Sequence, residues 1–584
     1  MQLLEHFKEL TLHPKNAEEL KGLILQLAVQ GKLTKQWRMV NSDVEPASVL
    51  LEKIEVEKDE FIKETKRRKE KVQLSITKEE EPFDLPISWE WSRMLNICHL
   101  ITDGTHHTPK YLDNGIPFLS VKNLSQGGID FSDTKFISLE EHKDLIKRCN
   151  PEYEDVLLTK IGTTGIAKVI DIKTDFSIFV SVALLKIAKQ NLFPYFIEHC
   201  INSPFIKQQS KDGTEGVGNK NLVLRKIKDF LIPIPPLEEQ KAIVAIVNQL
   251  FAEVEQLEAM AKERIQLKAD FVTSALNQLT QAAEQDTASQ WEFLQQHFGT
   301  FFTEKENIKK LREGVLQLAV QGKLTRDWRA IRQTQGIPIE HASTLLEKIK
   351  AEKSKLIKDK VFQKPQQSGE IMPDEFENTS PKSWQIAKIV DLCFVTKLAG
   401  FEYTKYIKLE DSGEIPVIRA QNVKMNRLDE RNLKYIDKDT SELLYRCALT
   451  KPCLLMTFIG AGIGDVALFN KPQRWHLAPN VAKLEPFNYY EEKISPNYLL
   501  YYLMSPEGQK QIFKSSKATA QPSLSMGTIR DAIVTLPPLE EQKVIVDKVN
   551  TLMTLCDKLK KEIETHQTSQ EQWMKSCLRE VFEN

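Results

Sequence analysis

The ten residues LQLAVQGKLT occur twice in this chain, at Leu25–Thr34 and again at Leu316–Thr325. In both places a Trp-Arg pair follows two residues later, at Trp37-Arg38 and Trp328-Arg329. Ten identical residues in a row are very unlikely to recur by chance. The second half of the chain therefore repeats the first, with a long period that is typical of a duplicated architecture.

Other segments repeat in the same order. ASVLLEKIEVEK at Ala47 matches ASTLLEKIKAEK at Ala342, and PISWEW at Pro86 matches PKSWQI at Pro381. IPFLSVKNL at Ile116 matches IPVIRAQNV at Ile415, and PPLEEQKAIV at Pro235 matches PPLEEQKVIV at Pro537. The offset drifts from 291 to 302 residues, so insertions between the copies are small. Both copies keep every segment, which argues against a duplication in which one copy lost its function.

Part of each copy is predicted to be helical. Gly31 and Gly322 follow an apolar run and fit the left-handed position that ends a helix. A longer helix should begin at each Pro-Pro pair, with the following Glu pair at the positive end of the helix dipole. Apolar residues then recur four and three apart, as in a coiled-coil seam, at Ile243, Val247, Leu250, Val254, Leu257 and Ala261 and at Ile545, Val549, Leu552, Cys556, Leu559 and Ile563. A helix packed on a globular core is the alternative, but a length of about 45 residues, or roughly 65–70 Å, favours the coiled coil.

The remaining part of each copy mixes short β-rich runs with Gly, Asn and Asp turns, which is typical of compact α/β domains. The runs are Ile116–Val121, Asp155–Ile161, Ile415–Arg419 and Leu454–Ile459. The predicted organisation is a helical region (1–85), a domain (86–236), a central helical region (237–380), a second domain (381–538) and a C-terminal helix (539–584).

Composition and charge narrow the class of protein. The chain of 584 residues is 41% hydrophobic and 28% charged, as in globular proteins, and no apolar run is long enough to span a membrane. The eight cysteines show no disulfide or zinc spacing, so reduced thiols in a cytoplasmic protein are expected. The net charge of −1 is weak evidence against nucleic-acid binding. However, residues 381–538 hold 21 basic against 16 acidic residues, and residues 86–236 hold 18 against 17.

This arrangement resembles the specificity subunits of type I restriction–modification enzymes over nearly the whole chain. The motifs that carry the resemblance are QGKLT followed by Trp, DGTHHTP at Asp103, GIPFLSVKNL at Gly115, LLTKIGTTG at Leu157, and PPLEEQ twice. Each motif alone is weak, but together and in order they are specific. The resemblance implies an α+β or α/β fold with two target-recognition domains, separated and flanked by long helices in an antiparallel coiled coil, with a pseudo-two-fold internal repeat. It also implies binding of double-stranded DNA, two methyltransferase subunits and motor–nuclease subunits, with S-adenosylmethionine, ATP and Mg²⁺ on those partners and no cofactor or metal here.

Candidate DNA-binding residues in the first domain are short donors, acceptors and cations that suit base edges or phosphates. They are Thr102, Asp103, Gly104, Thr105, His106, His107, Thr108, Lys122, Asn123, Thr159, Lys160, Gly162, Thr163, Thr164, Asn219 and Asn221. The plain alternatives are a turn held by Asp103 and Thr105, exposed polar residues at a strand end, and a hairpin turn around the glycines.

The second domain has different candidate residues at the corresponding positions, where Gln421 and Asn422 align with Lys122 and Asn123. The candidates are Lys405, Tyr406, Arg419, Gln421, Asn422, Thr457, Gly460, Gly462, Gln521 and Ser523. Arg225, Lys226 and Arg530 are further candidate phosphate partners, although a lone surface cation is usually only solvated.

No catalytic motif is recognisable. Asn150–Tyr153 (NPEY) departs from the NPPY motif of adenine methyltransferases and is predicted to be a turn, and Gly460–Gly464 lacks the spacing of a nucleotide loop. The sequence therefore predicts a non-catalytic DNA reader. A coiled-coil scaffold that binds only protein is the alternative, and it would not need two divergent domains between nearly identical helices.

Overall fold

The computed structural model describes residues 16–66, 76–125, 127–216, 220–283, 286–362, 369–372, 376, 380–488, 491–514 and 523–583. The chain divides into two compact units, Met1–Arg264 with Thr568–Asn584 and Ile265–Gln567. The division falls inside both long helices, so each unit contains parts of both. No helix in the described part of the chain is long and apolar enough to cross a membrane.

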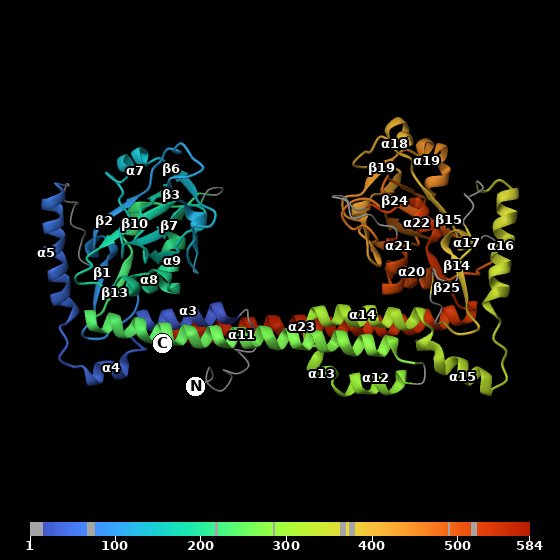
Figure 1. Cartoon of the computed structure of the whole chain (residues 1–584), viewed down its shortest axis with the longest axis horizontal. Helices are drawn as coiled ribbons and strands as arrows, with labels where there is room; N and C mark the ends of the chain where they lie inside the picture. Colours follow the sequence, from blue (N-terminus) through green and yellow to red (C-terminus); the bar gives the residue numbers. More distant parts are fainter. Residues whose placement is uncertain are drawn as a thin grey trace. The chain divides into compact units, whose positions relative to one another are not determined.

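The helical layer of unit 1 begins with α3 (Asn16–Val29), α4 (Lys35–Val40) and α5 (Ala47–Thr65). Helix α3 ends as predicted, because Gly31 adopts a φ of +70° and its N–H donates to the Ala28 carbonyl. A Cβ at Gly31 would lie 2.7 Å from Pro86 Cγ, so the stop also needs glycine for space. Helix α5 lies along the side of the domain at β2 (Cys98–Asp103). Helix α3 and the first part of α11 (Leu237–Gln281) run beneath β13 (Leu231–Ile234) and α8 (Pro194–Asn202) (Figure 1).

The domain of unit 1 is built on a four-stranded antiparallel sheet in the order β2-β10-β7-β8. A three-stranded sheet, β6-β3-β9, adds one parallel pair between β3 and β9. The strands and helices are β1 (Glu90–Arg93), α6 (Met94–Ile97), β2 (Cys98–Asp103), β3 (Ile116–Leu119), η1 (Val121–Asn123), β4 (Leu124–Ser125), β5 (Gly128–Ile129), β6 (Lys135–Ile137), α7 (Leu139–Leu145), β7 (Val156–Thr159), β8 (Ala167–Val169), β9 (Ser177–Ile178), β10 (Val182–Ile187), α8 (Pro194–Asn202), α9 (Pro204–Asp212), β11 (Thr214–Glu215), β12 (Asn221–Leu222), α10 (Leu224–Lys228) and β13 (Leu231–Ile234).

Unit 2 repeats this frame. Its sheets have the orders β15-β24-β21-β22 and β19-β16-β23-β20, again with one parallel pair, β16 with β23. Its elements are α12 (Thr287–Gln296), α13 (Phe298–Phe301), α14 (Lys305–Val320), η2 (Lys323–Thr325), α15 (Arg326–Thr334), α16 (Ala342–Lys358), β14 (Gln385–Lys388), α17 (Ile389–Leu392), β15 (Cys393–Lys397), α18 (Gly400–Tyr406), β16 (Ile415–Ile418), η3 (Ala420–Asn422), β17 (Val423–Lys424), β18 (Arg427–Leu428), β19 (Lys434–Ile436), α19 (Lys438–Leu443), η4 (Tyr445–Cys447), β20 (Ala448–Leu449), β21 (Cys453–Thr457), β22 (Val466–Phe469), β23 (Trp475–Leu477), β24 (Val481–Pro486), α20 (Pro496–Met504), α21 (Pro506–Phe513), α22 (Met526–Asp531), β25 (Ile533–Leu536) and α23 (Leu539–Glu583). The four predicted β-runs are confirmed as β3, β7, β16 and β21.

A buried glutamate at the start of each long helix explains why most of the sequence motifs occur in both copies. In unit 1 the Glu239 carboxylate accepts hydrogen bonds from Thr34 Oγ1 (2.6 Å), Arg38 Nη1 (2.5 Å) and Trp89 Nε1 (2.8 Å). We call these four residues the helix-entry lock. It joins the QGKLT-Trp-Arg segment, the Ser-Trp segment and the PPLEEQ segment at one side chain.

Unit 2 contains the same lock. Glu541 accepts hydrogen bonds from Thr325 Oγ1 (2.6 Å), Arg329 Nη1 (2.5 Å) and Trp384 Nε1 (2.9 Å). The glutamine after each glutamate is buried too: Gln240 accepts from the Phe193 N–H, and Gln542 from the Ser495 N–H. The repeated motifs are thus structural, because they connect each domain to its helices.

Both long helices contain 45 residues, as predicted. Ile243 and Val247 pack in the domain core of unit 1, and Ile545 and Val549 pack in that of unit 2. Later positions pack on helices: Val254 shares a cluster with Trp573 in unit 1, and Val272 shares one with Ile563 in unit 2. Within each unit, α11 therefore packs against part of α23. The start of each long helix thus packs on a globular core, and its later part packs on other helices, so each of the two alternatives applies to part of the apolar seam.

Candidate nucleic-acid interface

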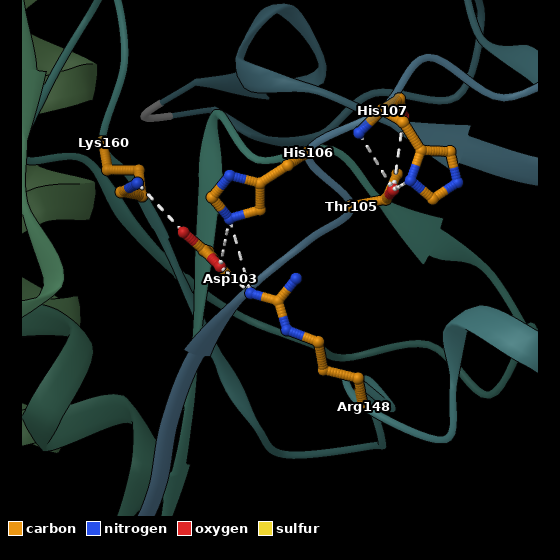
Figure 2. A network of polar contacts seen from close by, with 6 residues as sticks. All are labelled: Asp103, Thr105, His106, His107, Arg148 and Lys160. Carbon is orange, nitrogen blue, oxygen red and sulfur yellow. Dashed lines mark hydrogen bonds and ion pairs between the residues drawn. The ribbon is translucent and has the colours of Figure 1, made fainter.

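The loop after β2 is organised by the buried carboxylate of Asp103 (Figure 2). Lys160 Nζ donates to Asp103 Oδ2 at 3.1 Å, and His106 Nε2 lies 3.2 Å from Oδ1. Arg148 Nη2 also donates to Oδ1. Lys160 is almost fully buried, whereas His106 and Arg148 are exposed. Asp103 and Lys160 thus form a buried ion pair that positions two exposed basic side chains.

Close packing fixes the rest of this loop. A Cβ at Gly104 would lie 2.0 Å from the Ile178 carbonyl oxygen, so only glycine fits there. Thr105 is buried, and its Oγ1 lies 3.0 Å from His107 Nδ1. His106, His107 and Thr108 are exposed, while Thr102 is buried in β2. Of the predicted loop residues, the two histidines and Thr108 are therefore the ones whose side chains a ligand can reach.

Asn123, which follows β3, and Asn422, which follows the equivalent strand β16, both use their side-chain amides for hydrogen bonds within their own loops. Asn123 Oδ1 accepts the Ser120 N–H, and its Nδ2 donates to the Asp130 carbonyl at 3.0 Å. Asn422 makes the equivalent bonds to Arg419 and Asp429. Both are buried, so we leave these two predicted DNA-binding residues out of the candidate interface and assign them a structural role.

The neighbours of these asparagines are exposed. Lys122 pairs with Asp133 at 2.9 Å on the surface, and Gln421 occupies its place in the second domain. Arg419 is half-buried and donates through Nη2 to the Asn432 carbonyl at the surface of the same loop. These three side chains remain candidates.

The loops after β7 and β21 carry the predicted glycines. Thr159 and Thr457 are fully buried, and Thr159 Oγ1 accepts the Ile166 N–H, so they belong to the frame. Exposed Gly162, Gly460 and Gly462 have φ values of +84°, +103° and +89°, which glycine tolerates without strain. The remaining candidates in the loop after β7 are exposed Thr163 and half-buried Thr164, whose Oγ1 lies 3.4 Å from Thr214 Oγ1.

Several candidate segments meet at one end of the main sheet. Ile161 bridges to Asn221, and Ile459 bridges to exposed Ser523. Lys160 and Val121 both contact Ser181 through their N–H groups. Lys122, the loop 160–165 and Asn221 are therefore neighbours in unit 1, and the buried pair Asp103–Lys160 connects them to the histidines.

Other predicted residues lie on separate elements, although Arg530 lines one pocket together with Ile459 and Ser523. Lys405 and Tyr406 lie on α18, where the ammonium is 4.9 Å from the ring centroid. Arg225 and Lys226 lie on α10, and Arg530 lies on α22. Asn219 and Gln521 lie outside the described residues. The turn predicted at Asn150–Tyr153 lies two residues later, at Glu152–Asp155, where the Asp155 N–H donates to the Glu152 carbonyl.

The two domains share a frame but not its site chemistry. Asp103 pairs with Ala183 across the sheet, and Lys397 occupies the equivalent position opposite Ala482. Phe458 follows buried Thr457 as Lys160 follows Thr159, and Lys397 Nζ lies 5.0 Å from its ring centroid. Arg446 keeps the place of Arg148 but pairs with Glu402. The buried ion pair Asp103–Lys160 of the first domain is thus replaced in the second domain by a cation–aromatic contact between Lys397 and Phe458.

Sequence reasoning missed two features here. Arg148 is one, and the only available signal was the Arg-Cys pair that recurs at Arg446-Cys447. The other is the turn Lys424–Arg427, where two cations flank Met-Asn between short β-runs. Among the described residues, no group of three or more His, Cys, Asp or Glu side chains could hold a metal ion.

The α+β frame occurs twice, and each copy is joined to its long helix by the same helix-entry lock. The exposed loops of the two copies differ, which defines a protein with two related but different recognition domains. The sequence matches the family described as "Type I restriction modification DNA specificity domain" over residues 86–267 and 381–566. The chain belongs to this family and is a specificity subunit of the type I restriction–modification class with two target-recognition domains.

The chain is also similar to known specificity subunits along nearly its full length. The chain is 25% identical to the type I restriction enzyme EcoAI specificity subunit of Escherichia coli, covering 95% of this chain and 92% of that protein. It is 26% identical to the EcoEI specificity subunit of Escherichia coli over the same shares. Among solved structures, the HsdS subunit from Thermoanaerobacter tengcongensis is 16% identical, with a TM-score of 0.36 over 86% of this chain and 98% of that one.

Proposed function

We propose that this chain reads a split, asymmetric target in double-stranded DNA, with one half-site for each domain. The observation that carries the proposal is the contrast between identical locks and divergent exposed loops. Domains that hold different side chains at equivalent positions should select different bases. Two readers on one chain can contact two half-sites with an unread gap between them.

We further propose that the repeated helices dock two copies of one methyltransferase subunit, and that motor–nuclease subunits join this assembly. S-adenosylmethionine, ATP and Mg²⁺ would bind to those partners, while this chain supplies no catalytic group and acts in the cytoplasm. Native mass spectrometry of the purified complex should show two methyltransferase subunits per chain. A single such subunit at saturating concentration would contradict this stoichiometry. Isothermal titration of the isolated chain with S-adenosylmethionine should show no micromolar binding.

The decisive test is selection on random-sequence DNA. The purified complex of this chain with its methyltransferase partner should retain duplexes that contain two fixed half-sites at a constant gap. A protein-only scaffold would retain no sequence preference, and that result would refute DNA reading by this chain.

A further inference from the structure

The second domain carries a two-residue hairpin next to its glycine loop. Strands β17 and β18 are joined by Met425 and Asn426, and Asn426 adopts a φ of +62°. The Asn426 N–H donates to the Val466 carbonyl at 2.9 Å, which places the turn beside the end of the loop 458–465. Thr457 Oγ1, at the start of that loop, lies 3.5 Å from the Ala420 carbonyl of η3. The hairpin therefore borders the loops that already form the candidate interface.

The side chains of Met425, Asn426 and Arg427 in this turn are exposed to solvent. Met425 is 39% exposed, and Asn426 and Arg427 are exposed as well. Within the described residues, the Asn426 amide makes no hydrogen bond, in contrast to the buried amide of Asn422. Arg427 likewise forms no hydrogen bond or ion pair in that part of the chain. The positive φ favours an asparagine at 426, because asparagine tolerates that conformation. The turn does not require the exposed apolar side chain of Met425, and it leaves the Asn426 amide free to bind a ligand.

The acidic groups nearby are largely neutralised by other cations. Asp429 accepts two charged hydrogen bonds from Arg431, at 2.8 and 2.6 Å, and Glu430 pairs with Lys471 at 2.6 Å. Burial raises the pKa of Asp465, and the positive charge of Lys424 opposes that rise. The hydrogen bonds of Arg431 are the main cause that lowers the pKa of Asp429, and the charge of Arg427 adds to this effect. Arg427 makes no ion pair of its own among the described residues, so its guanidinium can contact an anionic ligand.

The corresponding hairpin of the first domain is different. Strands β4 and β5 are joined around Gly127, whose N–H donates to Ser125 Oγ, and Gly128 begins β5. It has no cation and no apolar side chain at the positions of Lys424, Met425 and Arg427. The two domains thus differ in this element as they differ at Asp103 and Lys397.

We propose that the hairpin Lys424–Arg427 is a base-reading element of the second domain and enters the major groove of its half-site. A two-stranded ribbon fits that groove, an asparagine amide matches the two edge groups of adenine, and an apolar side chain can contact the thymine methyl. Asn426 reads an adenine, Met425 contacts a neighbouring thymine methyl, and Arg427 contacts a phosphate. This inference rests on the proposed DNA-reading function.

The test compares Asn426→Gly and Asn426→Ala in the complete complex. Glycine accepts a positive φ without strain, so Asn426→Gly removes the amide and keeps the turn. Selection on random DNA should show that both variants lose preference for adenine at one position of the second half-site, roughly 10- to 100-fold. Loss in Asn426→Ala alone would mean that Asn426 only shapes the turn, and would overturn the proposal.

A matched control lies in the same domain. Asn432 is exposed, has a φ of +57°, and holds Arg419 only through its backbone carbonyl, which glycine retains. Asn432→Gly should leave both half-sites unchanged. Arg427→Ala should weaken binding to all sequences and reduce the salt slope by about one unit.

The outcomes separate the two levels of inference. If the unmodified complex selects a split motif and the Asn426→Gly complex selects the same bases with the same preference, the hairpin proposal fails and the DNA-reading function stands. If the unmodified complex selects no motif, the function itself fails.

Discussion

The Glu239 carboxylate lies 2.5 Å from the Arg38 guanidinium, although 201 residues separate them in the sequence. Glu239 has no exposed side-chain surface, and Arg38 is mostly buried. Trp89 donates to the other carboxylate oxygen, so the entrance to the domain is fixed by the same group. A buried charge with several donors is specific because any missing partner leaves it unsatisfied.

Removing the cation of one lock should destabilise one unit only. Arg38→Ala leaves a buried carboxylate without its counter-charge, which costs about 3–5 kcal/mol. Calorimetry should show a lower transition temperature for unit 1, and Arg329→Ala should do the same for unit 2. An Arg38→Ala protein that melts like the unmodified one would show that the lock is dispensable.

The buried pair Asp103–Lys160 should couple stability to reading. Asp103→Asn leaves the Lys160 ammonium buried without an anion and frees His106 and Arg148 from their common acceptor. We expect unit 1 to lose stability and the first half-site to be read less strictly. In Asp103→Asn/Lys160→Met the buried charge is gone, so stability should return in part while reading stays relaxed. Full recovery of reading in the double variant would contradict a positioning role for Asp103.

Reading should be modular between the two domains. His106→Ala and Lys122→Ala should alter the first half-site and leave the second unchanged. A contact to a base edge should cost about 1–3 kcal/mol at one position, whereas a phosphate contact should weaken binding to all sequences. Sequencing of the methylated sites will distinguish these results, and a change in the second half-site would refute modularity.

Acid should destabilise unit 1 through His99. Burial lowers the pKa of His99 from 6.5 to about 4, and Lys58 adds to the effect. Because the folded pKa is below the unfolded one, protonation favours unfolding. The stability is complete above about pH 6.5 and falls as the pH decreases toward 4. Glu57, whose carboxylate oxygen is 3.2 Å from His99 Nε2, has a pKa raised by burial, so its own protonation acts in the opposite direction.

The variant His99→Phe isolates this contribution. It removes the titrating group and keeps a ring next to Phe61, which stacks on His99 with centroids 5.0 Å apart. The transition temperature of unit 1 should then depend less on pH between 6.5 and 4. An unchanged pH dependence would assign the effect to other groups.

The gap between half-sites should depend on the long helices. A four-residue insertion lengthens a helix by about 6 Å, nearly two base-pair steps. Because Ile243 and Val247 belong to the domain core, the insertion should follow Val254, with a matching one in the paired part of α23. The selected gap should lengthen while both half-sites keep their bases. An active complex with an unchanged gap would mean that the helices do not set the spacing.

The sequence predicts the repeat, the 45-residue helices and the main strands well, because each depends on local patterns such as heptads, Pro-Pro entrances and alternating apolar runs. It does not predict the role of Glu239, which looks like one of two glutamates at a helix dipole. The partners Thr34, Arg38 and Trp89 are distant in the chain, and only folding brings them together.

The same limit applies to the candidate interface. Asn123 and Asn422 have the residue type of a base reader, but burial commits their amides to their own loops. Asn426 has the same chemistry and is exposed, yet nothing in its local sequence separates it from a turn asparagine. Residue type indicates what a side chain can bind, and only its neighbours in space decide whether it is free to do so.

Unit 1 contains the last residues of the chain as well as the first ones. Trp573 packs against the cluster of Ala17, Leu20, Leu23 and Val254, but residues 265–567 must be translated before it exists. At 5–20 residues per second, the ribosome needs roughly 15–60 s for that stretch. The unit that begins synthesis first is therefore completed last. A chain terminated just after Gln567 would contain every residue of the second unit, whereas its first unit would still lack the last part of α23.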